Sequence, residues 1–225
     1  MESNKAVVLF SGGLDSATCL ASAIDKGYNC TAFTINYNQR HSYEVTCSKK
    51  YLIDYPEIKH VIFDLDLKQI GGSALTDLEI KVPSMPTEGI PITYVPARNT
   101  IFLSLAASYA EKNNIRDIFI GVNSIDYSGY PDCRPEYISA IQTAINLGTK
   151  LGIEGKKINI HTPLIKMSKI EIVKLGTKLG INYSKTLSCY KPDSKGHACG
   201  VCDSCRFRKE GFRGAKISDP TKYIE

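Results

Sequence analysis

The string SGGLDS at residues 11–16 combines residue types that bind phosphate groups. Two adjacent glycines allow positive φ angles and a close approach of backbone N–H groups to an anion, while Ser11 and Ser16 add hydroxyl donors. An apolar run precedes the string and a helical pattern follows it, so the positive end of a helix would face the same anion. The sequence therefore predicts a pyrophosphate-binding loop. The simpler alternative is a strand-to-helix turn with Asp15 or Ser16 as the N-cap.

Asp15 is the unusual member of this string. A carboxylate beside bound phosphates repels them unless a divalent cation lies between the two, so we expect Mg²⁺ to bind with ATP at Asp15. The chain contains neither the GxxxxGK[ST] pattern of a Walker A loop nor the GxGxxG pattern of dinucleotide-binding folds. The residues indicate a different class of nucleotide-binding loop.

Four of the eight cysteines lie in the last fifth of the chain, at Cys189, Cys199, Cys202 and Cys205. A Cys-x2-Cys step places two thiolates on one tight turn, as a tetrahedral Zn²⁺ site requires, and four thiolates close the coordination shell. We therefore expect a structural zinc ion that orders a segment with little core of its own. Two disulfides, an iron–sulfur cluster, and a site in which His197 replaces a cysteine are the alternatives.

The composition is that of a folded protein. The 225 residues include 28 Lys and Arg against 23 Asp and Glu, and the net charge of +5 suits an anionic ligand without requiring nucleic acid. The N-terminal residues contain neither a signal-peptide core nor a membrane span, so we expect a cytoplasmic protein with reduced thiols and no membrane partner. A basic run at residues 206–209 leaves a zinc-stapled nucleic-acid-binding module as an alternative.

Alternating apolar runs and helical patterns must position these groups. We expect strands at residues 6–10, 31–36, 60–65, 118–122 and 157–161. We expect helices at residues 16–26, 42–53, 99–112, 135–147 and 168–179. Asn99 is the predicted N-cap of the third helix, and Ser168 with Glu171 forms a predicted capping box in the fifth. This order predicts an α/β fold with a doubly wound, five-stranded parallel sheet and ligands at the carboxyl ends of its strands.

Two features concern the organisation of the chain. Residues 66–96 interrupt the alternation with several glycines and prolines, over a length that is typical of a functional or mobile loop. We expect one main domain at residues 1–185, because the length suits a single α/β core. A small C-terminal four-cysteine zinc-binding segment at residues 186–225 is expected to pack on it.

The SGGLDS string after the first strand resembles the signature of the PP-loop ATP pyrophosphatase superfamily. The resemblance implies cleavage of ATP between its α- and β-phosphates and adenylation of a carbonyl or carboxyl oxygen. It also implies an adenine nucleotide alpha hydrolase-like, Rossmann-like version of the predicted sheet. The ATP-binding residues implied on this chain are Phe10, Ser11, Gly12, Gly13, Leu14, Asp15, Ser16, Ala17, Thr18, Cys19 and Leu20.

Two further strings are VPARN at residues 95–99 and GVNSIDYSGYPDCRPE at residues 121–136. Together with the phosphate loop and the cysteines, in this order over nearly the whole chain, they resemble the QueC family of 7-cyano-7-deazaguanine (preQ0) synthases. The resemblance implies an ATP-dependent ligase of queuosine biosynthesis that converts 7-carboxy-7-deazaguanine and ammonia to the nitrile, through an adenylated carboxylate and then an adenylated amide. It also implies a homodimer.

Residue roles follow from this resemblance. Arg98 and Lys169 would stabilise negative charge on the α-phosphate, beside Asp15 and Ser16 of the loop. A deazaguanine offers hydrogen-bond donors, a flat ring and a carboxylate, which Asp, Tyr and Arg side chains can bind. The expected substrate-binding residues are Asn99, Asp126, Tyr127, Tyr130, Asp132 and Arg134. Cys133 is interpreted as a buried thiol, because ammonia needs no covalent carrier.

The competing functions differ in their acceptor or in their class. Another PP-loop ligase, of the tRNA-thiolating or amidating type, would share the ATP chemistry. A thiolating enzyme would need a redox-active cysteine pair and a tRNA-binding domain, and neither is evident in the sequence. The favoured interpretation requires no nucleic-acid partner, only small-molecule substrates and ATP.

Overall fold

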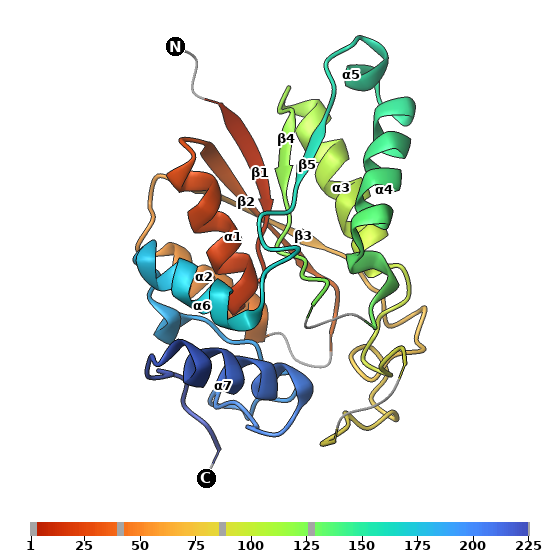
Figure 1. Ribbon diagram of the computed structural model, residues 1–225. Coiled ribbons are helices and arrows are strands. Elements are labelled where there is room, and N and C mark those ends of the chain that lie inside the picture. The colour runs from red at the N-terminus through yellow and green to blue at the C-terminus, as the bar shows by residue number, and fades with distance from the viewer. Residues whose placement is uncertain (1–3, 40–42, 86–88, 126–128, 225) are drawn as a thin grey trace.

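The computed structural model describes residues 4–39, 43–85, 89–125 and 129–224. Five strands form one sheet in the order β3-β2-β1-β4-β5, and every neighbouring pair is parallel (Figure 1). The strands are β1 Lys5–Leu9, β2 Asn29–Asn36, β3 Lys59–Asp64, β4 Asp117–Phe119 and β5 Asn159–His161. The predicted five-stranded parallel sheet is therefore confirmed.

Helices connect the strands and cover both faces of the sheet. The α-helices are α1 Leu14–Asp25, α2 Tyr43–Leu52, α3 Arg98–Lys112, α4 Pro135–Gly148, α5 Lys150–Ile153, α6 Lys169–Lys178 and α7 Asp203–Ala215. Two short 3-10 turns, η1 Pro131–Cys133 and η2 Tyr183–Lys185, lie in connecting segments. In Figure 1, α1, α2 and α6 lie on one side of the sheet, and α3 and α4 lie on the other.

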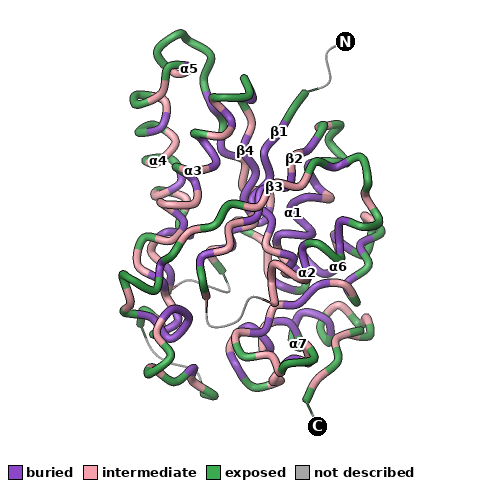
Figure 2. Tube along the Cα trace, turned by 180° about the vertical axis from the view of Figure 1, so that it is seen from behind, coloured by how far each residue is buried: buried purple, intermediate pink, exposed green. Residues whose placement is uncertain are grey.

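The central strand β1 shows why two layers of helices are needed. Ala6 and Val8 point into one apolar cluster and Val7 and Leu9 into another, and none of the four is more than 8% exposed. A strand that is buried on both faces reads as a continuous apolar run, which is typical of a parallel sheet with helices on each side. Figure 2 shows this buried centre in purple. The predicted doubly wound fold is confirmed.

The start of α3 differs from the prediction. Asn99 was expected to be its N-cap, but the helix begins at Arg98 and the cap position is Ala97, which has a φ of 53° and makes no side-chain cap hydrogen bond. The carboxylate of Asp132 accepts a hydrogen bond from the backbone N–H of Asn99 at 3.0 Å and caps the helix from another segment. In contrast, the predicted capping box of Ser168 and Glu171 at α6 is confirmed.

Helix α7 lies outside the predicted set and packs closely against α6. A Cβ atom added to Gly211 would lie 2.5 Å from Cγ of Lys169. One added to Gly214 would lie less than 2.5 Å from Ile170. A larger side chain at either position would displace these neighbours, so the glycines of α7 permit the close approach of the two helices. The C-terminal segment is thereby held against the element that carries Lys169.

Arg208 fixes α7 from its buried side. Its guanidinium donates hydrogen bonds to the carboxylate of Asp219 at 3.0 Å, the hydroxyl of Thr186 at 2.9 Å and the carbonyl of Tyr183 at 3.1 Å, and its side chain is 3% exposed. The guanidinium also lies 5.0 Å from the ring centroid of Phe212. A buried cation with this many partners supports the fold of the C-terminal segment.

The described part of residues 66–96 contains no helix or strand, as the sequence predicts. Among the described residues, no helix has both the length and the apolar character needed to cross a membrane.

Candidate active site

The loop after β1 adopts the tight turn that its glycines predict. Gly12 has a φ of +81°, and a Cβ at this position would lie 2.6 Å from the backbone nitrogen of Ser48 in α2. Ser11 and Ser16 close the loop, because their hydroxyl oxygens lie 3.2 Å apart and the Ser11 N–H donates to Ser16 Oγ at 3.2 Å. The first turn of α1 therefore faces the carboxyl end of the sheet, as an anion site requires.

Asp15 forms an ion pair with Lys169. Nζ of Lys169 lies 2.6 and 2.8 Å from the two carboxylate oxygens of Asp15, and the two side chains are 7% and 22% exposed. The sequence predicts a divalent cation that offsets the charge of this carboxylate beside phosphates. In the structure, the ammonium group of Lys169, the first residue of α6, offsets part of that charge.

The loop after β4 packs directly on this site. A Cβ on Gly121 would lie 3.0 Å from the carbonyl oxygen of Asp15, so glycine permits the close approach. The amide of Asn123 donates to the carbonyl of Leu164 at 3.0 Å and also to that of Met167. These bonds tie the loop after β4 to the segment that leads into α6. The point between β1 and β4, where the strand order reverses, is thus the centre of the site.

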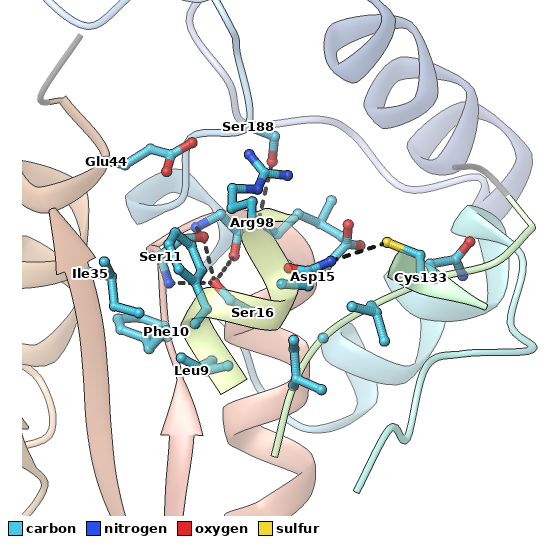
Figure 3. Close-up of a pocket in the computed structure, with 18 of the residues that line it drawn as sticks. Leu9, Phe10, Ser11, Asp15, Ser16, Ile35, Glu44, Arg98, Cys133 and Ser188 are labelled. Atoms are coloured by element: carbon cyan, nitrogen blue, oxygen red, sulfur yellow. Dashed lines mark hydrogen bonds between the residues drawn. The ribbon is translucent and has the colours of Figure 1, made fainter. Parts of the chain in front are cut away.

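A cavity opens at this point between the phosphate loop, α3 and the C-terminal segment (Figure 3). In Figure 3, Ser11, Asp15, Arg98 and Ser188 surround the same space, with Glu44 and Cys133 toward opposite sides. Its charged lining residues are Asp15, Glu44 and Arg98. Its aromatic lining residues are Phe10, Phe33, Tyr37, Phe102, Tyr130 and Tyr190. An apolar and aromatic wall with a few charged groups suits a flat heterocycle that carries an anionic group.

The eleven predicted ATP-binding residues differ in their relation to the cavity. Six of them line the cavity: Phe10, Ser11, Gly13, Leu14, Asp15 and Ser16. Gly12 forms the turn against α2 and is not a lining residue. Four further residues of α1, Ala17, Thr18, Cys19 and Leu20, are at most 1% exposed and face the core. Thr18, for example, donates its hydroxyl to the carbonyl of Leu14 at 2.9 Å. Helical periodicity turns these residues away from the loop.

Arg98 and Asn99 both line the cavity from the start of α3. Arg98 donates a hydrogen bond to the hydroxyl of Tyr37 at 3.2 Å, and its guanidinium lies 5.8 Å from the centroid of that ring. Asn99 faces the neighbouring loop, where its side-chain amide donates to the carbonyl of Asp132 at 3.2 Å and to Sγ of Cys133 at 3.4 Å. The two side chains thus have different roles, with Arg98 fixed by an aromatic ring and Asn99 by backbone.

The loop that was expected to bind the substrate is only partly assembled at the cavity. Asp126 and Tyr127 lie outside the described residues. Tyr130 lines the cavity, and its hydroxyl lies 2.9 Å from that of Thr93. Asp132 is 5% exposed and caps α3 instead of facing the cavity. Arg134 is exposed and donates to the carbonyl of Pro131 at 3.1 Å.

Cys133 lines the cavity but is not an activated nucleophile. Burial, together with the neighbouring charge of Asp132, raises the pKa of its thiol to about 12. The thiolate is the reactive form of cysteine, so a thiol with this pKa is inert near neutral pH. This agrees with its interpretation as a buried side chain.

The four C-terminal cysteines gather as their spacing predicts. The sulfur atoms of Cys189, Cys199, Cys202 and Cys205 all lie within 4.8 Å of one another. Backbone N–H groups of Lys191 and Cys199 each donate to Sγ of Cys189 at 3.2 Å. Converging thiols whose acceptor capacity is partly met by backbone donors fit a metal ion. Four cysteines that could hold a metal are therefore confirmed.

His197 lies outside this set. Its Nδ1 lies 2.9 Å from a carboxylate oxygen of Asp193, and its backbone N–H donates to the same carboxylate at 2.7 Å. The imidazole closes a local turn and is not among the converging ligand atoms. The alternative in which His197 replaces a cysteine is therefore wrong for the described structure.

The basic side chains of residues 206, 208 and 209 make contacts within the protein. Arg208 is buried, as described above, and Arg206 pairs with Asp203 of the same helix. Lys209 donates to the carbonyl of Gly200 at 3.0 Å and lies 4.2 Å from the ring centroid of Tyr223. A nucleic-acid-binding stripe needs its cations available to phosphates, so these contacts disfavour that use.

The cavity residues that the sequence did not point to include Tyr37, Glu44, Ser188 and Tyr190. Tyr37 follows the end of β2, where a ligand-contacting residue could have been anticipated from the fold. Glu44 begins α2 and has no distinguishing local pattern. Ser188 and Tyr190 are the neighbours of Cys189 in the sequence. The cysteine spacing indicates a metal site there and gives no sign that these two residues also line the cavity. Only the tertiary structure brings these four residues together.

Comparison with known proteins gives close relatives over the full chain. Residues 5–216 match the sequence model of the family described as "Queuosine biosynthesis protein QueC". The chain is 54% identical over 224 residues to a 7-cyano-7-deazaguanine synthase of Pseudomonas fluorescens, with all of both chains covered. It is 56% identical over 220 residues to a 7-cyano-7-deazaguanine synthase of Dechloromonas aromatica, with 97% of this chain and 98% of the relative covered.

Solved structures with lower sequence identity share the fold. A 4-thiouridine synthetase in complex with RNA and bound ATP is 19% identical, with a TM-score of 0.55 over 98% of this chain and 47% of the other. An NMN synthetase from Francisella tularensis is 19% identical, with a TM-score of 0.50 over 98% of this chain and 80% of the other. These similarities establish a common architecture.

Proposed function

The chain belongs to the family of the queuosine biosynthesis protein QueC, and on this premise we propose that it is an ATP-dependent 7-cyano-7-deazaguanine synthase. The proposed substrates are 7-carboxy-7-deazaguanine, ammonia and ATP. The observation that carries the proposal is the cavity at the carboxyl end of β1 and β4, where the phosphate loop and Arg98 face the same space. This placement unites an anion-binding turn with a wall suited to a flat heterocycle.

The proposed reaction uses the same site twice. The carboxylate oxygen attacks the α-phosphorus of ATP and pyrophosphate leaves, and ammonia then displaces AMP from the acyl adenylate to form the amide. The amide oxygen next attacks a second ATP with loss of pyrophosphate, and elimination of AMP leaves the nitrile. Each adenylation concentrates negative charge on phosphate oxygens, so fixed cations and N–H donors at the loop supply the main stabilisation.

Lys169 and Arg98 are the cations that we propose for this role. Lys169 reaches the first turn of α1 through its pair with Asp15 and would hold its positive charge beside the phosphate loop. Arg98 lines the cavity beside Tyr37, which orients its guanidinium. Asp15 would position Lys169 and, together with the nucleotide, a Mg²⁺ ion. Ser16 would complete the loop.

The acceptor would lie against the aromatic side of the cavity. Tyr130 and Tyr190 both line it, and their hydroxyl oxygens lie 3.5 Å apart. Flat aromatic rings suit a deazaguanine ring, and hydroxyl groups can bond to its polar edge. We keep Asp126 and Tyr127 in the proposed binding set. Asp132 and Arg134 are proposed to act by supporting α3 and the loop.

We propose that the four-cysteine site holds one structural Zn²⁺. Four thiol ligands leave no coordination position for water, so the ion would order the C-terminal segment and take no part in the reaction. We further propose a cytoplasmic enzyme that acts as a homodimer. Elemental analysis and light scattering of the purified protein test these two points.

The functional proposal is tested by pyrophosphate release. Purified protein with Mg-ATP, ammonium and 7-carboxy-7-deazaguanine should release pyrophosphate, and omission of the acid or the ammonium should reduce the release strongly. Asp15→Ala should lose the activity. A protein that releases pyrophosphate only in the presence of tRNA and a sulfur donor would instead belong to the thiolating class, and the proposed acceptor would be wrong.

A further inference from the structure

Residues 187–190 connect the four-cysteine site to the phosphate loop. The backbone N–H of Leu187 donates to the carbonyl of Gly12 at 3.1 Å. Cys189, two residues later, is one of the converging thiols and accepts two backbone N–H donors. One short segment therefore forms a hydrogen bond with the phosphate loop through Leu187 and contributes Cys189 to the four-cysteine site.

Ser188 lies between these two contacts and reaches the first turn of α1. Its Oγ accepts a hydrogen bond from the backbone N–H of Leu14 at 3.2 Å. Leu14 is the first residue of α1, so this N–H is one that the helix cannot satisfy internally. Ser188 also lines the cavity, and Figure 3 shows it on the same side of the loop as Arg98. It thus caps the first turn of α1 beside the predicted pyrophosphate site and faces the ligand space.

We propose that Ser188 both positions the phosphate loop and donates to the bound pyrophosphate, and that the four-cysteine site acts through it to hold the loop in its binding conformation. The inference rests on the proposed ATP site but not on the identity of the acceptor. Gly12 packs against the backbone of Ser48 in α2 on one side of the loop. On the other side, Leu187 and Ser188 form hydrogen bonds with Gly12 and Leu14. The loop is fixed between them.

The hydroxyl of Ser188 should strengthen the binding of a pyrophosphate group. A serine that accepts a hydrogen bond through its oxygen keeps its own proton to donate. Ser188 can therefore hold the N–H of Leu14 and still offer a donor toward a phosphate oxygen in the cavity. Its removal should weaken the binding of a pyrophosphate group, because the loop loses a support and the anion loses a donor.

Nucleotide affinity measured by calorimetry tests this inference on the metal-loaded protein, with no acceptor present. For Ser188→Ala, the Kd for the α,β-methylene analogue of ATP should rise about 5- to 10-fold, as expected for one neutral hydrogen bond, while the Kd for AMP stays within about twofold. Ser188→Thr keeps a hydroxyl and should retain most of the affinity. Ser184→Ala is the matched control, since that exposed hydroxyl bonds to Asn182 and not to the loop.

Two further measurements separate positioning from general stability. Hydrogen exchange of the Leu14 amide should become faster in Ser188→Ala and not in Ser184→Ala, with melting temperature and metal content unchanged. The apparent affinity for the metal, measured by equilibrium competition with a chromogenic chelator, should be raised several-fold by the ATP analogue in the wild type but not in Ser188→Ala, because the coupling of two binding free energies is reciprocal.

The outcomes are distinct. Equal affinity of Ser188→Ala and the wild type for the ATP analogue, or tighter binding by the variant, would overturn the inference, and so would a metal affinity that responds to the analogue equally in both. A wild-type protein that binds no ATP analogue would instead contradict the proposed function itself.

Discussion

Nζ of Lys169 lies 2.6 and 2.8 Å from the two carboxylate oxygens of Asp15, and this pair joins the first turns of two helices that are far apart in the sequence. The contact is largely buried, with Lys169 only 7% exposed on its side chain. The charge of the Asp15 carboxylate is thereby compensated by a residue 154 positions away in the sequence. The pair defines the floor of the proposed ATP site.

Asp15 and Lys169 should therefore act as a unit. We expect Asp15→Asn and Lys169→Met each to lower the rate of pyrophosphate release by about 100- to 1000-fold, the range typical for loss of a preorganised electrostatic group. The double variant should lose much less than the product of the two single effects, since residues that act together are not additive. Lys166→Met, which removes an exposed lysine of the same segment, is the control. Independent, multiplicative losses would contradict this coupling.

Gly12 offers a test of the loop conformation. Gly12→Ala combines the strain of a positive φ, about 1 kcal/mol, with a Cβ only 2.6 Å from the backbone nitrogen of Ser48. Gly27→Ala has the same φ of +81° but no atom within 4 Å of the added Cβ. Both variants should lose stability in urea denaturation, and only Gly12→Ala should also lose affinity for ATP. Normal ATP binding by Gly12→Ala would show that the loop geometry is unimportant.

Local sequence patterns predicted the fold well where the physical cause is itself local. The apolar run of β1, the glycine turn at Gly12 and the capping box at Ser168 depend on neighbouring residues, and the structure confirms each of them. The N-cap of α3 was predicted wrongly because its donor is satisfied by Asp132, from a distant part of the chain. A short-range pattern contains no information about such a partner.

Site residues could be predicted where they belong to a recognisable sequence motif. Asp15 and the four cysteines stand in recognisable strings, and the structure places them in one cavity and one cluster. Glu44 and Ser188 line the same cavity without any local pattern, because only tertiary packing brings them there. Asp132 had the right chemistry for a ligand but is used within the fold. Residue type alone does not distinguish these two uses.

The four-cysteine site should control the folding of the C-terminal segment. We expect about one zinc ion per chain by elemental analysis, and none in Cys199→Ser after dialysis. Removal of the ion by a chelator should expose α7 to proteolysis, since the proposed ion would order this segment. Cys30→Ala removes a buried thiol outside the cluster and should keep its metal. A brown protein that contains iron would contradict the assignment of zinc.

Arg208 should be a stability residue without a catalytic role. Arg208→Met leaves the carboxylate of Asp219 without its buried cation and should lower the free energy of unfolding by about 3–5 kcal/mol. Arg213→Met, at an exposed position on the same helix, should have little effect. Urea denaturation measures both. A small change for Arg208→Met would mean that the buried network contributes little.

The same ion pair predicts a pH dependence of stability. Burial alone would raise the pKa of Asp219, but Arg208 and hydrogen bonds from Tyr223 and Thr221 outweigh it and lower that pKa below its usual value. The pair therefore stabilises the fold above the pKa of the unfolded carboxyl, and this contribution is lost as the pH falls through the folded pKa. Asp219→Asn should be less stable than the wild type at neutral pH, and the difference should shrink in acid.

The central claim is that one site consumes ATP to convert an acid and ammonia to a nitrile. Mass spectrometry of the products, with parallel assay of pyrophosphate, tests it most directly. Incubation with 7-carboxy-7-deazaguanine, ammonium and Mg-ATP should yield 7-cyano-7-deazaguanine with two pyrophosphates and two AMP for each nitrile, and a transient amide. Absence of both amide and nitrile under these conditions, from folded protein that binds ATP, would contradict the claim.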